Sequence, residues 1–210
     1  IYFIKKDVPD AKTFYLREML TNKRLDFDAY EKASKYGLAA VNKRDAKISW
    51  DMPLEIPGES VVSWMGVKSN KIFIQSTVKN KMSVSVYDIV GGNLLWKISR
   101  DISSLCTSYS LTPALYEDFL LLPLCAVIEY INVENGTVDK RYSNEDVDHI
   151  YSFNQNSIYN NTMNFVMEDI SEYEYVVVDL DKNITLSGGL LDLDDPGLGM
   201  WINNIFIDLT

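Results

Sequence analysis

The chain has 210 residues, 47% of them hydrophobic and 24% charged, which is typical of a folded globular protein and excludes intrinsic disorder. Its formal net charge of −10 combines +5 over residues 1–110 with −15 over residues 111–210, and the acidic half is expected to repel the phosphate backbone of nucleic acids. No apolar run approaches the roughly 18 residues of a membrane-spanning helix, and two cysteines are too few for a disulfide framework.

The first 37 residues are predicted to form a short strand and a helical hairpin. The strand covers residues 1–4 and is expected to end at Lys5. A candidate N-cap at Asp10 begins the first helix, and the second helix is expected to end before Gly37. Because the sequence begins with Ile1 rather than methionine, we expect the segment to be processed or cut from a longer chain.

From residue 38 onward, one pattern recurs at a nearly constant period. In each copy, a strand rich in β-branched or aromatic residues ends in Asn or Asp, and a polar turn leads to a second strand. The residues at the strand ends, which we name the Asx markers, are Asn42, Asp88, Asn132 and Asp179. They are 46, 44 and 47 residues apart, and such a constant period is typical of repeat proteins.

A turn followed by an inner strand is expected upstream of the later markers, at residues 70–74, 117–121 and 156–159. One unit then holds about four short antiparallel strands, which is the size of a propeller blade. The Asn-Gly and Gly-Gly pairs in these units supply the positive backbone angles of tight hairpins. The predicted fold is mainly β: a partial or small β-propeller of about four blades over residues 38–210, preceded by the helical hairpin in residues 1–37.

Two of the repeats carry a recognisable sequence motif. The segment Gly37–Trp50 resembles the repeat of quinoprotein-type β-propellers, in which a strand ending in Asn or Asp leads through a turn to a closing Trp. The segment Val86–Trp96 matches the same pattern. In the third copy Lys140 replaces the Trp, and in the first copy Ala46 stands where the pattern has Gly.

This resemblance implies an architecture and a role for the closing tryptophans. Trp50 and Trp96 are implied to be structural residues that pack between blades. Non-catalytic scaffolds, such as the large lumenal subunit of the ER membrane protein complex, are similar to this pattern. Their resemblance implies a scaffold in an extracytoplasmic or ER-lumenal compartment.

Candidate residues for catalysis and metal binding are few. His149 is the single histidine and lies in an acidic stretch that we predict to be a loop, and no nucleophile-elbow motif occurs. The Asp-rich segment 192–197 suits calcium, but Pro196 and Asn203 depart from the calcium-loop pattern. The repeats are also too few for the ring that holds a quinone cofactor. The sequence therefore predicts no catalytic, cofactor or metal site.

The expected function is a non-enzymatic scaffold for protein–protein interaction, as a subunit or fragment of a larger assembly. The acidic second half favours a basic protein partner, and its candidate contacts are Asp146, Asp148, Glu172 and Glu174. The same charges can also serve solubility alone. Two alternatives remain open: a bacterial immunity protein that neutralises a basic toxin, and a hydrolase that uses the acidic loops.

Overall fold

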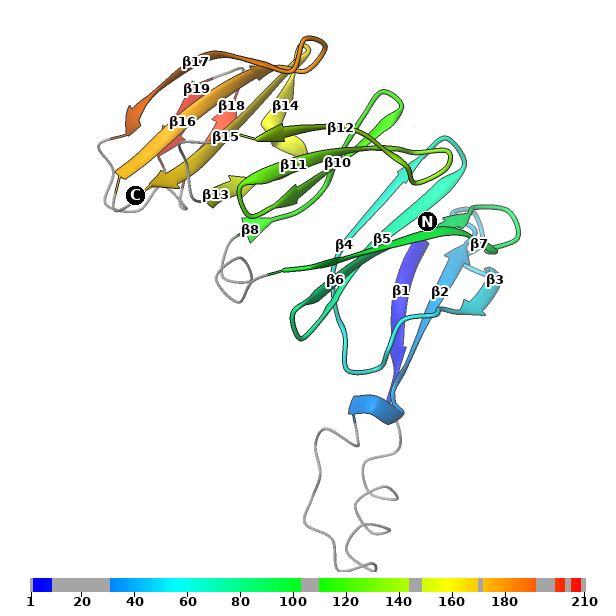
Figure 1. Cartoon of the computed structure of the whole chain (residues 1–210). Helices are drawn as coiled ribbons and strands as arrows, with labels where there is room; N and C mark the ends of the chain where they lie inside the picture. Colours follow the sequence, from blue (N-terminus) through cyan, green and yellow to red (C-terminus); the bar gives the residue numbers. More distant parts are fainter. Residues whose placement is uncertain are drawn as a thin grey trace, which may run out of the picture.

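The computed structural model describes residues 2–8, 31–102, 110–143, 149–169, 172–191, 199–202 and 205–208. Within this part, small β-sheets follow one another along an open arc, with the first sheet at one end and the last hairpin at the other (Figure 1). The predicted helical hairpin lies mostly in residues 9–30, outside the described residues, so it stays a prediction, as does a domain boundary at residue 37.

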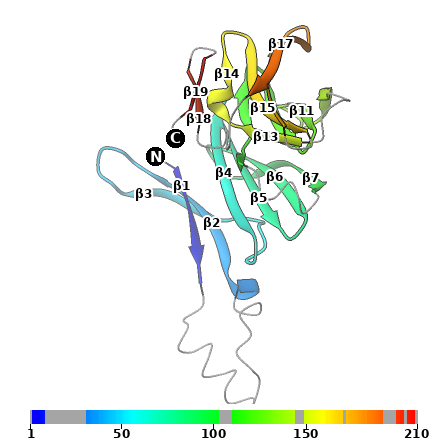
Figure 2. The same cartoon turned by 90° about the vertical axis from the view of Figure 1, so that its left-hand side faces the viewer.

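Each sheet is built from strands that are consecutive or nearly consecutive in the chain (Figure 2). The first sheet contains β1 (Tyr2–Asp7), β2 (Lys35–Val41) and β3 (Ile48–Pro53). The second contains β4 (Val61–Lys68), β5 (Lys71–Val78), β6 (Lys81–Asp88) and β7 (Leu94–Asp101). The third contains β9 (Ala114–Tyr116), β10 (Phe119–Leu124), β11 (Val127–Asn132) and β12 (Val138–Ser143).

The fourth sheet is the largest in the described part of the chain. It contains β13 (His149–Phe153), β15 (Thr162–Asp169), β16 (Glu172–Asp179) and β17 (Ile184–Leu191). The short strand β8 (Ser110–Leu111) pairs with β13 in parallel, and β14 (Ile158–Tyr159) pairs with β15. A hairpin of β18 (Gly199–Ile202) and β19 (Ile205–Asp208) follows.

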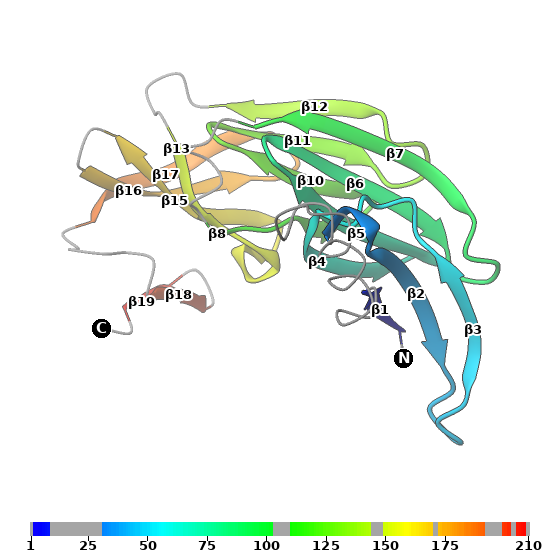
Figure 3. The ribbon, with the colours of Figure 1, turned by 90° about the horizontal axis from the view of Figure 1, so that it is seen from below.

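Seen from below, the sheets follow one another along the arc (Figure 3). Apolar clusters lie between successive sheets and hold the arc together. In β5, Ile72 and Ile74 pack with Leu38 of the first sheet, whereas Phe73 packs with Leu120 of the third. Successive side chains of a strand point to opposite faces, so a strand between two neighbours must be apolar on both. This explains why the inner strands are continuous apolar runs rather than alternating ones.

The four Asx markers occupy equivalent positions in the first four sheets. In each sheet, the residue two places before the marker pairs with the residue eight places after it, and a β-bulge follows at once. These pairs are Ala40 with Trp50, Val86 with Trp96, Tyr130 with Lys140, and Val177 with Ser187. The shared register confirms the four-fold repeat, including the fourth copy, whose sequence match is poor.

The turn after each marker is held by the marker's own side chain. Its oxygen accepts a hydrogen bond from the backbone N–H two residues further on, as Asn42 does from Arg44 at 2.9 Å. The other three markers accept the equivalent bond. The carboxylate of Asp88 accepts backbone hydrogen bonds, of which the bond from the Val90 N–H has the largest effect. These bonds stabilise the charged carboxylate and lower the pKa of Asp88.

A substitution at Ala46 tests the strain in the first of these turns. The residue four places after each marker has a positive φ, and it is Gly in the second and third sheets but Ala46, with φ 55°, in the first. The left-handed region costs an L-residue about 1–2 kcal/mol, so Ala46→Gly is expected to raise the free energy of unfolding by about 1 kcal/mol in urea denaturation. Ala126→Gly, at a turn residue without positive φ, is expected to lower it. Equal effects of the two changes would contradict this account.

The second predicted helix does end before Gly37: residues 31–33 are helical, and strand β2 begins at Lys35. Two other local expectations are wrong. The first strand does not end at Lys5: β1 continues to Asp7, because the Lys5 amine pairs with Asp51 of β3 at 2.6 Å, which keeps it on the sheet. His149 is the first residue of β13 rather than a loop residue, because it pairs with Glu168 of β15.

The turn and the strand expected at residues 156–159 are both present, but this strand is not the inner one. The turn is a 3₁₀ helix, η2 (Gln155–Ser157), which Asn154 caps by accepting a hydrogen bond from the Asn156 N–H at 2.8 Å, and the short strand β14 follows it. The inner strand of the fourth sheet is β15, which follows a turn with positive φ at Asn160 and Asn161.

Candidate interaction sites and the joints between sheets

Trp96 forms the joint between the second and third sheets. It lies on β7, its indole N–H donates to the Val133 carbonyl at 3.2 Å, and its ring contacts Phe73 edge to face with centroids 6.0 Å apart. A Cβ atom added to Gly136, whose φ is 74°, would lie 2.8 Å from the indole ring. Gly136 therefore provides both the turn conformation and the space for Trp96.

Lys140 takes the place of the tryptophan at the joint between the third and fourth sheets. Its ammonium group donates to the Leu180 carbonyl at 2.8 Å and lies 4.6 Å from the centre of the Tyr130 ring. Val133 and Leu180 both directly follow an Asx marker. The two joints thus contain the same kind of hydrogen bond. Its donor is the side chain eight residues after one Asx marker, and its acceptor is the backbone carbonyl of the residue directly after the next marker.

Trp50 is placed differently from Trp96. Its ring lies 6.0 Å from that of Tyr2, a neighbour within the first sheet. The contact with the second sheet at this level is made by Met52, whose sulfur would lie 1.8 Å from a Cβ added to Gly92. Trp50 and Met52 both pack against the apolar cluster that joins the first two sheets, which includes Leu38, Ile72 and Ile74.

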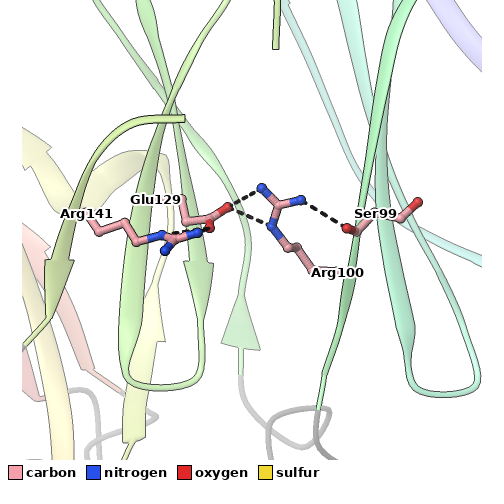
Figure 4. Close-up of polar contacts among 4 residues, drawn as sticks. All are labelled: Ser99, Arg100, Glu129 and Arg141. Carbon is pink, nitrogen blue, oxygen red and sulfur yellow. Dashed lines mark hydrogen bonds and ion pairs between the residues drawn. The ribbon is translucent and has the colours of Figure 1, made fainter. Parts of the chain in front are cut away.

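Glu129 forms a buried ion cluster across the joint between the second and third sheets. Its side chain on β11 is 2% exposed. Arg141 of β12 donates to Oε1 from Nε at 3.0 Å and from Nη2 at 2.8 Å, and Arg100 of β7 donates to Oε2 from Nε at 2.9 Å (Figure 4). Sequence reasoning missed this cluster, although a charged residue within the apolar run of β11 signals a buried partner.

Of the four candidate partner-binding acids, the structure describes two. Asp146 and Asp148 lie outside the described residues. Glu172 begins β16, and the side chain of Glu174 is half-buried. The partner-binding role of these residues therefore stays a prediction.

Two hollows flank the beginning of β4, and Val61 and Ser63 line both. One, of about 590 Å³, lies between β4 and β1 and includes Ile4. The other, of about 420 Å³, lies between the second and third sheets at the end that carries the β5–β6 and β10–β11 turns; we name it the intersheet cavity. Its lining includes Val61, Gln75, Met82, Ile102, Pro123 and Leu124.

No cluster of three or more His, Cys, Asp or Glu residues suited to a metal ion occurs among the described residues. The Asp-rich segment 192–197 lies outside them. In that described part, no helix has the length and apolarity needed to span a membrane. Cys125 takes part in a disulfide, and the other cysteine of the chain, Cys106, lies outside the described residues.

Comparison with known proteins gives the fold but no close relative. No protein-family model and no curated protein match the sequence. The structure is similar to that of BamB from Moraxella catarrhalis, at 11% identity over 75% of this chain and 49% of that chain, with a TM-score of 0.52. It is also similar to dihydro-heme d1 dehydrogenase NirN, at 11% identity over 77% of this chain and 35% of that chain, with a TM-score of 0.50.

These similarities show a β-propeller-like fold and confirm the expected architecture of mainly β structure with about four blades. The chain spans about half the length of the BamB chain that it matches. One of the two similar structures is a dehydrogenase, so the shared fold carries no statement about catalysis. The described chain is an arc of β-propeller blades.

Proposed function

We propose that this chain is a non-enzymatic protein-interaction scaffold whose acidic second half docks a basic protein. The proposal depends chiefly on one observation: exposed carboxylates of the second half face solvent without an ion-pair partner among the described residues. These are Glu117, Asp118, Asp139 and Asp181. Exposed charges of one sign steer an oppositely charged partner and accelerate its association.

The basic first half neutralises only part of this charge. Lys71 pairs with Glu134 at 2.6 Å, and Arg100 pairs with the buried Glu129 at 2.8 Å. Both pairs lie across the joint between the second and third sheets. In the fourth sheet, Asp181 is exposed and has no ion-pair partner among the described residues, whereas Asp179 pairs with Lys182 at 3.2 Å.

The proposal extends to the setting of the protein. The motifs in Gly37–Trp50 and Val86–Trp96 support a scaffold of the kind found in the large lumenal subunit of the ER membrane protein complex. A disulfide at Cys125 supports an oxidising compartment, either extracytoplasmic or ER-lumenal. The chain would then act as one segment of a larger assembly.

Neutralising the four candidate contact acids of the second half is expected to slow binding of the basic partner. The variant carries Asp146→Asn, Asp148→Asn, Glu172→Gln and Glu174→Gln. Partners are captured from native extract by cross-linking and identified by mass spectrometry, and their association rates are measured at low and at physiological salt. For the unchanged chain, the rate is expected to fall steeply with salt, because exposed charges are screened beyond about 8–10 Å.

A charge-matched control separates the docking surface from net charge. It changes four exposed acids of the first half to amides: Asp7, Asp45, Glu55 and Asp101. This control is expected to retain the association rate, while circular dichroism shows that both variants are folded. A salt-independent rate, or equal rates for the two variants, would show that the acidic face serves solubility alone.

A further inference from the structure

Three turns between strands contain the acceptor sequence for N-linked glycans, which is Asn, any residue except Pro, and then Ser or Thr. The asparagines are Asn135, Asn160 and Asn183. A glycan at such a sequence is attached to the side-chain nitrogen of the asparagine and is bulky. A folded chain therefore accepts it only where that nitrogen faces open solvent, and the structure separates the three positions by this criterion.

Asn135 meets the criterion. It is exposed in the turn between β11 and β12. Its side-chain oxygen accepts hydrogen bonds from the Thr137 N–H at 2.9 Å and from the Thr137 hydroxyl at 2.7 Å. Because both donors hold the oxygen against the turn, the side-chain nitrogen is directed away from it. The turn thus presents an open amide nitrogen next to the threonine hydroxyl that the acceptor sequence requires.

The arrangement at Asn135 is local and does not interfere with the fold. Both hydrogen bonds join residues two places apart, as in an Asx turn, so they can form before the sheets pack. In the folded chain, the residues on either side anchor the turn: Glu134 pairs with Lys71 at 2.6 Å, and Gly136 provides space for Trp96. A glycan on Asn135 would extend from an ordered turn without displacing a buried group.

Asn183, in the turn between β16 and β17, does not meet the criterion. Its side-chain nitrogen donates to the Arg141 carbonyl of β12 at 2.9 Å, and its side-chain oxygen is buried. The amide therefore faces the third sheet, and a glycan on this nitrogen would enter the joint between the third and fourth sheets. Chains that are glycosylated at Asn183 are expected not to fold.

Asn160, in the turn between β14 and β15, is exposed, but its threonine is held differently. The Thr162 hydroxyl donates to the Tyr159 carbonyl at 2.6 Å, so the backbone holds it rather than the asparagine. Of the three turns, the one at Asn135 combines an open nitrogen with a threonine hydroxyl bonded to the same amide group.

We propose that Asn135 carries an N-linked glycan. The donor is an oligosaccharide that is attached to a lipid through a diphosphate. The bond between its first sugar carbon and the diphosphate breaks, and the same carbon forms a bond to the Asn135 nitrogen. That nitrogen loses one proton, and the lipid diphosphate leaves. The inference rests on the extracytoplasmic or ER-lumenal setting in the proposed function, because N-linked glycans are found on secreted proteins.

The test places the full chain behind a cleavable signal peptide in a eukaryotic cell, and folded chains are isolated from the lumen and the medium. Peptide N-glycosidase in water labelled with oxygen-18 converts each glycosylated asparagine to labelled aspartate, which mass spectrometry locates. The label is expected at Asn135 in most chains and is not expected at Asn183. A label that is absent from Asn135, or no higher there than at Asn160 or Asn183, would overturn the proposal.

Matched variants connect the modification with the turn. Asn135→Gln and Thr137→Ala are each expected to abolish the shift in gel mobility that peptide N-glycosidase removes, whereas Thr137→Ser keeps the hydroxyl group and is expected to retain the shift. Asn183→Gln is the control, because it changes the acceptor sequence of the neighbouring sheet and is expected to leave the shift unchanged. Circular dichroism shows whether each variant is folded. A shift that persists in Asn135→Gln would contradict the assignment.

The result is independent of the docking role. Glycan occupancy is measured without a protein partner and does not depend on the acidic residues. An unoccupied Asn135 together with a salt-dependent association rate would overturn this inference alone. Conversely, an occupied Asn135 together with a salt-independent association rate would overturn the docking role alone.

Discussion

Replacing Trp96 with alanine is expected to lower the free energy of unfolding by about 3–5 kcal/mol, the usual cost of removing a large aromatic side chain from a core. The change removes the ring contact with Phe73, the hydrogen bond to Val133 and the packing over Gly136 together. Because these groups belong to two sheets, the loss affects the joint rather than one strand. Urea denaturation followed by circular dichroism measures the effect.

Two related variants divide the contribution of Trp96 into its parts. Trp96→Phe keeps an aromatic ring but removes the donor, so it is expected to cost about 1 kcal/mol from the lost hydrogen bond alone. Trp50→Ala is expected to cost less than Trp96→Ala, since Trp50 packs against Tyr2 within its own sheet. A loss below about 1 kcal/mol for Trp96→Ala would show that the joint does not depend on this residue.

Removing both arginines around Glu129 is expected to be similarly destabilising. In the double variant Arg100→Met and Arg141→Met, the carboxylate of Glu129 stays buried without a cation. Breaking a buried ion pair in this way costs about 3–5 kcal/mol, because the remaining charge has neither water nor a partner. Thermal and urea denaturation at neutral pH measure the loss.

A third change tests whether the unpaired charge is the cause. Adding Glu129→Leu to the double variant replaces the carboxylate by an apolar side chain in an apolar strand, so most of the stability is expected to return. Glu129→Leu alone leaves Arg100 and Arg141, whose side chains are 28% and 61% exposed and can be hydrated, and is expected to cost less than the double variant. If the triple variant is no more stable than the double variant, the destabilisation comes from lost packing of the arginine stems instead.

The repeat could be predicted from the sequence because its turns depend on local chemistry. An Asx side chain that accepts a backbone N–H two residues away leaves a short, recognisable pattern, and Asp88 followed by Gly-Gly is its clearest copy. The turn at the start of residues 156–159 has a local cause as well. Asn154 and Ser157 form a capping box that stabilises the 3₁₀ turn before β14, whereas the inner position in the sheet belongs to β15.

The contacts between sheets could not be predicted in the same way. Glu129 meets Arg100, 29 residues earlier in the chain, only because two sheets pack together. Such features depend on the packing of elements, whereas the period of the repeat depends on each element alone.

The exchange of Trp96 for Lys140 at equivalent joints has a consequence for how such chains diverge. These two joints need a donor of sufficient reach to the carbonyl after the next marker, and an indole and an ammonium group both provide it. An exchange between these chemically unlike residues therefore keeps the hydrogen bond. Repeats under this constraint can differ in sequence while the geometry of the arc persists.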